Sequence, residues 1–188
     1  MIDLIREAAS IQEFIESKNW DFYFIGGITV QVWGQPRLTQ DIDFTLFTNL
    51  KNEPDYISAF LQRYRPKFSD AAEFALSNRV LPMFTDSGIG IDLTLGGLSD
   101  MSESLARSSY QEFVDGIKLR ICSAEDLIIL KTMAGRGRDW IDIESVVIRQ
   151  NNLDWEYIVS TLECVTDNDG LSPRIDKLRS LKSQFYKQ

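Results

Sequence analysis

The sequence has 188 residues, long enough for one well-packed domain or for a domain with a helical appendage. It contains no histidine, which excludes Ser-His-Asp and Cys-His catalysis and histidine metal sites, so any chemistry must use carboxylates, Lys, Arg, Tyr, hydroxyls or a bound metal. The net charge of −8 argues against broad nonspecific binding to a phosphate backbone, and no apolar run approaches the length of a membrane span.

The N-terminus and the two cysteines indicate the environment of the protein. Residues 2–17 place apolar side chains at helical spacing, which predicts an amphipathic helix that covers a sheet. Because this segment lacks the apolar core of a signal peptide, we expect a cytoplasmic protein with no membrane partner. Cys122 and Cys164 form no CxxC pair, so disulfide frameworks and zinc clusters are not expected, and both side chains are expected to be buried.

Residues 22–46, FYFIGGITVQVWGQPRLTQDIDFTL, predict a strand, a turn at Gly26-Gly27, a short helix, a polar loop and a second strand. Side chains alternate faces along a strand, so Asp41 and Asp43 share one face, opposite an apolar face. Two neighbouring carboxylates repel each other unless they are solvated, protonated or neutralised by a cation. A bound metal ion is the neutraliser that would give the pair a purpose.

The glycine pair and the loop that follows the short helix have two interpretations each. Gly26-Gly27 lies between an apolar strand and an apolar helix, where glycines let a phosphate approach backbone amides at a helix N-terminus. A Gly-Gly pair alone is more often just a turn. Arg37 and Thr39 could contact phosphate or simply fix the loop.

The middle of the chain predicts a helix followed by strands. Residues 54–65 have the apolar spacing of a helix that Pro66 closes. Residues 72–95 predict two or three adjacent antiparallel strands, EFALS, RVLPMF and GIGIDLTLGG, separated by turn signals. Asp92 repeats the parity of the Asp41 strand, so three carboxylates meet on one face if the two strands are neighbours. The Ser-rich residues 99–109 predict a short helix or loop over the sheet.

The C-terminal part predicts a hairpin and then helices. Residues 110–121 form a hairpin pattern with its turn at Asp115-Gly116, and the capping box Ser123–Asp126 begins a helix that breaks at residues 135–137. Further helices are predicted over residues 139–149, 154–165 and 171–186. The last segment, residues 173–188, carries a basic run that we interpret as a solvated face rather than a nucleic-acid contact. The run comprises Arg174, Lys177, Arg179, Lys182 and Lys187.

These elements together predict an α/β (α+β) fold, with a mixed, largely antiparallel sheet backed by helices and a helical C-terminal portion. The pattern GG-x13-D-I-D-F with a later I-D-L resembles the nucleotidyltransferase superfamily typified by DNA polymerase beta. FIGGITVQVWGQPRLTQDIDF and AEDLIILKTMAGRGRDWIDIESV resemble the AbiEii-type nucleotidyltransferases, toxins of type IV toxin–antitoxin and phage-defence systems. The sequence departs from the pattern at Gly27, where many members have serine, and at Trp33, where the AbiEii block often has histidine.

The resemblance implies a Mg²⁺-dependent nucleotidyltransferase that moves an NMP from an NTP to an acceptor hydroxyl and releases pyrophosphate. It implies that Asp41, Asp43 and Asp92 are the catalytic, metal-binding residues, and a two-ion site is expected. The residues expected to bind the nucleotide are Gly26, Gly27, Thr29, Arg37, Thr39 and Lys131. The expected acceptor is tRNA, a protein or a small molecule, and an antitoxin protein is an expected partner.

Residues 1–122 are then the nucleotidyltransferase catalytic core, and residues 123–188 are a helical C-terminal part expected to pack with the core as one unit. Lys131, on or beside the apolar stripe of its helix, could extend its ammonium to solvent or contact the nucleotide phosphates. Arg136, Arg138 and Asp139 could form a functional cluster or a surface ion-pair network.

Two alternatives to an active enzyme come from other functional classes. A catalytically inactive nucleotidyltransferase-fold binding module would keep the fold without the reaction, although three clustered carboxylates would then have no use. A nucleic-acid-binding domain is disfavoured by the net charge.

Overall fold

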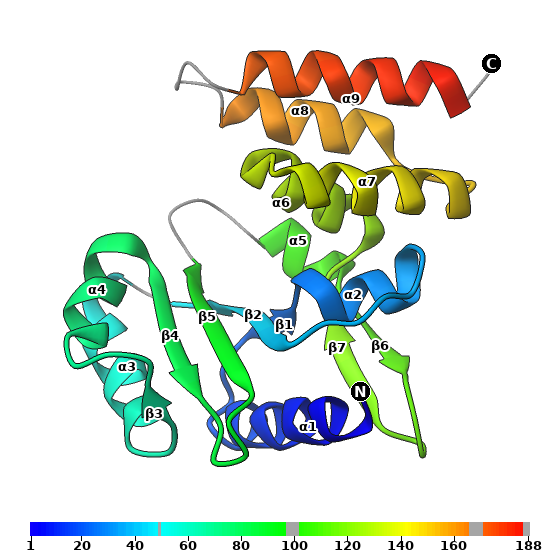
Figure 1. Cartoon of the computed structure of the whole chain (residues 1–188). Coiled ribbons are helices and arrows are strands. Elements are labelled where there is room, and N and C mark those ends of the chain that lie inside the picture. Colours follow the sequence, from blue (N-terminus) through cyan, green and yellow to red (C-terminus); the bar gives the residue numbers. More distant parts are fainter. Residues whose placement is uncertain (49, 97–101, 166–170, 186–188) are drawn as a thin grey trace. The chain divides into compact units, whose positions relative to one another are not determined.

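Figure 1 shows the computed structural model, which describes residues 1–188 except for 49, 97–101, 166–170 and 186–188. The chain divides into two compact units. The first unit contains Met1–Ile28 and Leu38–Cys122, and the second contains Thr29–Arg37 and Ser123–Gln188.

The first unit is built around a sheet. Its strands are β1 (Phe22–Phe24), β2 (Asp41–Phe47), β3 (Arg65–Pro66), β4 (Val80–Phe84), β5 (Gly90–Gly96), β6 (Ser109–Glu112) and β7 (Lys118–Ile121). Within the described residues they form one seven-stranded sheet in the order β3-β4-β5-β2-β1-β7-β6 (Figure 1). β2 pairs in parallel with β5 and β1 with β7, whereas the other neighbours pair antiparallel. The predicted mixed, largely antiparallel sheet is confirmed.

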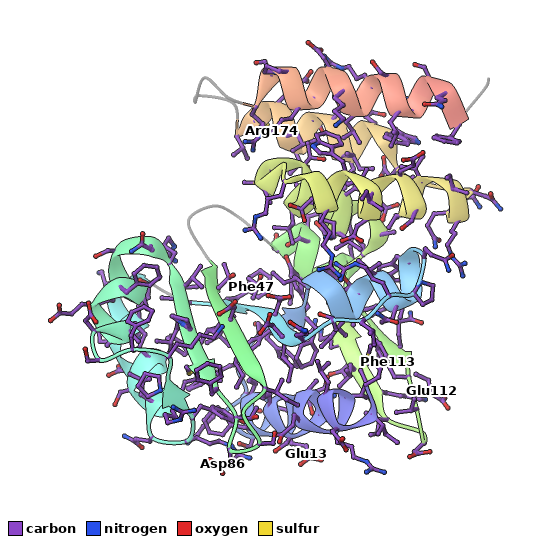
Figure 2. All side chains as sticks on the ribbon, in the orientation of Figure 1. Glu13, Phe47, Asp86, Glu112, Phe113 and Arg174 are labelled. Atoms are coloured by element: carbon purple, nitrogen blue, oxygen red, sulfur yellow. The ribbon has the colours of Figure 1, made fainter. Side chains whose placement is uncertain are left out.

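Helix α1 shows how the helices of the first unit attach to this sheet. The helices are α1 (Ile2–Ser17), η1 (Leu50–Asn52), α3 (Glu53–Leu61), α4 (Ala71–Asn78) and α5 (Ser102–Arg107). The buried side chains of α1 follow helical spacing, as the sequence predicts. Gln12 on this face donates from Nε2 to the Lys118 carbonyl at 2.9 Å and accepts from the Arg120 amide at 2.8 Å, while Glu13 points outward (Figure 2). This double hydrogen bond fixes α1 against β7.

The second unit is helical. Its helices are α2 (Gly26–Trp33), which begins in the first unit, α6 (Ala124–Ala134), α7 (Gly137–Arg149), α8 (Trp155–Cys164) and α9 (Ser172–Phe185). Ser123 caps α6 by accepting a hydrogen bond from the Asp126 amide at 3.0 Å, which confirms the predicted cap. The three helices predicted after it are also confirmed. None of the helices that the structure describes is long and apolar enough to cross a membrane.

Of the basic residues of α9, Lys177 and Arg179 are exposed, whereas Arg174 and Lys182 are half-buried. Arg179 contacts Glu163 and Asp176, and the Lys177 ammonium lies 4.2 Å from the centre of the Trp140 ring. Lys187, the last residue of the predicted basic run, lies outside the described residues.

The prediction of a strand over EFALS is wrong. These residues belong to helix α4, which buries Ala71 and Ala75 one turn apart. The helix preference of Ala, Glu and Leu outweighs the strand preference of Phe, in agreement with the helical spacing of the two alanines. The apparent turn at Ser77-Asn78 is the end of this helix, where Arg79 adopts the left-handed conformation of a C-cap. The two strands predicted after it are confirmed as the antiparallel pair β4 and β5.

The predicted helix over residues 54–65 is too long at its C-terminal end. Helix α3 ends at Leu61, and Arg65 is extended and pairs with Phe84 of β4. A residue that precedes proline is disfavoured in helical conformation, because its backbone clashes with the proline ring. Pro66 therefore affects the chain before its own position and creates the short strand β3.

The expected burial is correct for Cys122 and wrong for Cys164. Helix α8 buries Trp155, Ile158 and Leu162, which lie three to seven residues apart on one face. Cys164 follows Leu162 by two positions and therefore projects from the opposite side of the helix.

The core beneath the carboxylate strand is aromatic. Phe44 of β2 is fully buried, and its ring centre lies 5.9 Å from that of Phe24 and 5.7 Å from that of Phe60. Because Phe44 lies between Asp43 and Thr45, the packing of its ring holds the adjacent carboxylate position in place.

We expect Phe44→Ala to lower the free energy of unfolding by about 3–5 kcal/mol, because a fully buried ring is replaced by a cavity. Phe68→Ala is the matched control, since Phe68 is 40% exposed, and it should cost about 1 kcal/mol or less. Urea unfolding of both variants measures the difference. Equal losses would contradict this account of the core.

Candidate active site

The predicted meeting of three carboxylates rests on the pairing of β2 with β5. These strands are parallel neighbours, with Asp43 opposite Asp92 and Thr45 opposite Thr94. Asp41 is exposed, and Asp43 and Asp92 are partly exposed, whereas the apolar residues that alternate with them are buried. The predicted parity of the two strands is therefore confirmed, and the three carboxylates lie on the same face of the sheet.

Two glycines lie directly against these carboxylates. A Cβ atom added to Gly26 would be 2.2 Å from Oδ2 of Asp43, and one added to Gly90 would be 2.0 Å from Oδ1 of Asp41. Gly26 also has a φ of +66°, a conformation that residues with a side chain rarely adopt. Any other residue at either position would displace a carboxylate, so the glycines keep Asp41 and Asp43 in place.

The Thr39 side chain fills the space beside Gly27, as the Asp43 carboxylate fills the space beside Gly26. A Cβ atom on Gly27 would be 2.2 Å from Oγ1 of Thr39, and this hydroxyl lies 3.4 Å from the Asp41 carbonyl. The Thr39 hydroxyl, Gly27 and the carboxylate strand are thus neighbours at the start of α2. The helix dipole places partial positive charge at a helix N-terminus, so this is a favourable place for an anion.

Lys67 is a member of this group that the sequence analysis missed. Its ammonium lies 2.8 Å from Oδ1 of Asp92, and it is 3.4 Å from the point that a Cβ atom on Gly90 would occupy. No motif surrounds Lys67. Its amide donates to the Pro82 carbonyl at 3.0 Å, and Pro82 pairs with Asp92. Only the strand order β3-β4-β5 brings Lys67 to the carboxylates.

Asp41 and Asp43 fit a Mg²⁺ ion by their chemistry. Magnesium in proteins is typically held by one or two carboxylates together with substrate phosphates. The two carboxylates lie on one face of β2, and one oxygen of each occupies the space that a side chain on Gly26 or Gly90 would fill. In the described part of the chain, no group of three or more His, Cys, Asp or Glu side chains has the arrangement of a metal site. Asp92 is instead held by Lys67.

Two of the other predicted site residues belong to an ion-pair network in the second unit. Asp142 accepts hydrogen bonds from Nε and Nη2 of Arg37, both at 2.7 Å, and lies 2.6 Å from Nζ of Lys131. The same Lys131 nitrogen lies 3.1 Å from Oδ1 of Asp139. Oδ2 of Asp139 accepts from the Arg136 amide at the start of α7. The network fixes the loop after α2, helix α6 and helix α7 to one another.

Burial and charge oppose each other at Asp142. Its side chain is only 3% exposed, and this burial, the largest influence, acts to raise the pKa of Asp142. The hydrogen bonds and positive charges of Arg37 and Lys131 outweigh the burial and hold that pKa below its ordinary value. Asp142 is therefore a charged anchor of the second unit.

Three residues predicted to contact the nucleotide are paired or buried in the structure. The Lys131 side chain is 8% exposed and paired, so the interpretation in which its ammonium extends to solvent is wrong. Arg37 fixes its loop through Asp142. Thr29 is fully buried, so its hydroxyl is not open to a phosphate.

Comparison with known proteins identifies a family. A family model described as "Nucleotidyl transferase AbiEii toxin, Type IV TA system" matches residues 15–186 of the chain. No curated protein sequence is similar enough to match.

Two solved structures have a similar fold. An antigenic nucleotidyltransferase-like protein from Paracoccidioides brasiliensis has a TM-score of 0.52 at 13% identity, over 97% of this chain and 96% of its own. The lincosamide antibiotic adenylyltransferase LnuA, solved with bound lincomycin, has a TM-score of 0.51 at 14% identity, over 73% of this chain and 92% of its own. At such low identity these likenesses show a nucleotidyltransferase-like fold alone.

Gly26→Ala should cost more stability than backbone strain alone explains. The positive φ costs about 1–2 kcal/mol, and the added methyl group must also displace Asp43. Gly116→Ala is the matched control, because Gly116 has a φ of +75° but no atom within 4 Å of an added Cβ. Urea unfolding should give a larger loss for Gly26→Ala. A loss equal to that of the control would show that Asp43 moves away freely.

Asp142→Asn should lower the free energy of unfolding by about 3–5 kcal/mol, because it removes the shared partner of two cations in a buried network. Asp176→Asn is the control, since Asp176 is an exposed partner of Arg179, and its loss should be about 1 kcal/mol or less.

The Asp142→Asn variant also tests the direction in which the stability of the protein changes with pH. Because folding lowers the pKa of Asp142, its contribution is complete above the unfolded value of about 4 and is lost as the pH falls through the folded pKa. The stability of the wild type should therefore fall more steeply below about pH 4 than that of Asp142→Asn. If the stability of the two proteins falls equally with pH, Asp142 does not have a lowered pKa in the folded state.

Proposed function

Because the chain belongs to the AbiEii family of nucleotidyl transferase toxins, we propose that it transfers a nucleoside monophosphate from an NTP to an acceptor hydroxyl. One observation carries this proposal: the carboxylates of Asp41 and Asp43 lie against glycine backbone at the start of α2. A metal-binding pair thereby adjoins an anion-binding helix N-terminus. The two features together suit a Mg²⁺–triphosphate substrate.

The triphosphate would bind at the first turn of α2. The backbone amides at Gly26 and Gly27 would donate to its oxygens, and the hydroxyl of Thr39 lies beside Gly27 to add a further donor. Having no side chains, the two glycines allow close approach to the backbone. Serine is not required at position 27, because its place is filled by the Thr39 hydroxyl.

Asp41 and Asp43 would hold Mg²⁺ together with the phosphate oxygens. When bound, this ion supplies positive charge that neutralises the phosphates and favours departure of pyrophosphate. The protein's own contribution is to hold the two carboxylates on one face of β2, beside the first turn of α2.

Asp92 would take the proton of the acceptor hydroxyl. Its Oδ1 is occupied by Lys67, so Oδ2 is the oxygen that would accept this proton. The acceptor oxygen then forms a bond to the α-phosphorus, and the bond from that phosphorus to the oxygen bridging to the β-phosphate breaks. The electron pair leaves with pyrophosphate. No histidine is needed for this step.

Arg37 and Lys131 are the cations that the sequence offers for contact with the phosphates, and this remains a proposal. Asp142 and Asp139 hold both side chains in defined positions, and long flexible side chains bind phosphate more readily when they are so ordered. Contact with the nucleotide would add to, or replace, these ion pairs.

The biological setting follows from the family. We propose that the chain is the toxin of a type IV toxin–antitoxin system, with an antitoxin protein as partner in that system and with tRNA, a protein or a small molecule as acceptor. The reaction requires Mg²⁺ and NTP, and we place it in the cytoplasm. The alternative is a catalytically inactive binding module, and the experiment below distinguishes it from an active enzyme.

The test is incubation of the full chain with Mg²⁺ and each α-³²P-labelled NTP, alone and with total tRNA. Asp41→Asn/Asp43→Asn should lose label transfer by at least about 100-fold, as expected when electrostatic stabilisation of a reacting group is removed. Asp55→Asn/Asp86→Asn is the control of equal charge change, because both of these acids are exposed in the first unit. Its activity should equal that of the wild type.

Label found on RNA or on the protein would identify the acceptor class. A wild type that transfers no label but binds Mg²⁺–NTP by calorimetry would be a binding module. A wild type that does neither would overturn the proposal.

A further inference from the structure

The ammonium of Lys67 lies within the carboxylate group that the proposed reaction uses. It is 2.8 Å from Oδ1 of Asp92, and both side chains are partly open to solvent, at 24% and 36% exposure. We propose that Lys67 is a positioning residue that holds Asp92 and takes the place of a second divalent ion, so that the nucleotide-free site binds one Mg²⁺. This inference rests on the Mg²⁺ site proposed above.

Two contacts besides the one with Asp92 fix Lys67 in this position. Its backbone amide donates to the Pro82 carbonyl at 3.0 Å, which continues the pairing of β3 with β4. Its ammonium lies 5.6 Å from the centre of the Phe84 ring, the ring that Arg65 also faces at 5.0 Å. An aromatic face attracts a cation. The Phe84 ring and the β3–β4 pairing therefore give the ammonium a defined location beside Asp92.

The glycine of β5 places the same ammonium near the second carboxylate. The position of an added Cβ on Gly90 lies 3.4 Å from Nζ of Lys67 and 2.0 Å from Oδ1 of Asp41. The ammonium and the Asp41 carboxylate thus flank the same point above the Gly90 backbone. Lys67 pairs with Asp92 and also reduces the negative potential at Asp41.

The balance of charge indicates how many ions the nucleotide-free site would take. Asp41, Asp43 and Asp92 carry three negative charges when ionised, and Lys67 supplies one positive charge. Among these four side chains, a single Mg²⁺ at Asp41 and Asp43 balances the two negative charges that Lys67 does not. A second divalent ion would have to displace Lys67 from Asp92. The two-ion site expected from the sequence did not include this lysine.

The geometry of the acids agrees with this count. No described group of three or more acidic or other ligating side chains is arranged around a common metal position, although the three carboxylates share a face. Asp92 is directed to the lysine on the β3 side. Asp41 and Asp43 on β2 are the pair that the proposed function assigns to Mg²⁺.

The experiment counts bound Mn²⁺ by electron paramagnetic resonance in the full chain without nucleotide. The wild type should bind about one Mn²⁺, and Asp43→Asn should lose it. Lys67→Gln should bind a second Mn²⁺, because Asp92 is released. Lys67→Arg keeps the charge and should remain at one. Lys118→Gln is the control of equal charge change at an exposed lysine of the same unit, and it should match the wild type.

Mn²⁺ counts that differ from these would contradict the inference. Two Mn²⁺ ions on the wild type would mean that Lys67 does not exclude the second ion. One ion on Lys67→Gln, with a circular dichroism spectrum like that of the wild type, would mean that Lys67 does not govern the count. If Lys67→Gln does not fold, a count on Lys67→Arg that differs from the wild type decides against the inference, and an equal count supports it.

A failure of the proposed function would look different. If the wild type and Lys118→Gln bind no Mn²⁺ that depends on Asp43, the Mg²⁺ site itself is absent. The inference then falls together with the site, whereas Asp43-dependent binding with the wrong count removes the inference alone.

Discussion

Repulsion among Asp41, Asp43 and Asp92 is the constraint on which the first unit depends. The parallel pairing of β2 with β5 brings the three carboxylates to one face, and the folded chain must accommodate their charge. It does so by leaving Asp41 exposed, by pairing Asp92 with Lys67 and by placing glycine backbone against the other oxygens. Asp41 and Asp43 thereby share a face on which Asp41 is exposed and Asp43 partly exposed, as the proposed reaction requires.

The second unit neutralises Asp142 and Asp139 by burying them with cations of the protein, whereas the three carboxylates of the first unit are more exposed. Asp142 is enclosed by Arg37 and Lys131, and the lysine also meets Asp139, so every partner belongs to the protein. Removing water strengthens these interactions but makes an unmatched charge costly, so the network is expected to be sensitive to the loss of one member. The carboxylates of the first unit are more exposed and can exchange partners. This difference separates a site from a structural anchor.

Local features of the sequence predict much of this arrangement. The period of two along β2 and β5 placed the acids on one face, the Asp115-Gly116 turn located the hairpin, and Ser123 with Asp126 located the start of α6. Each of these depends on residues within a few positions of one another. The errors also have local causes: Ala71 and Ala75 form a helix where alternation suggested a strand, and Pro66 unwinds the residues before it.

The sequence alone therefore determined the glycine–carboxylate motif, its strand parity and the family resemblance, because these are short-range patterns. Only the tertiary structure decided which cations meet which acids. Lys67 is 25 positions from Asp92, and Arg37 is 105 positions from Asp142. Such pairs are created by strand order and helix packing, and their residues carry no local signal. The partners that tune the charge of the site are for this reason visible only in the folded chain.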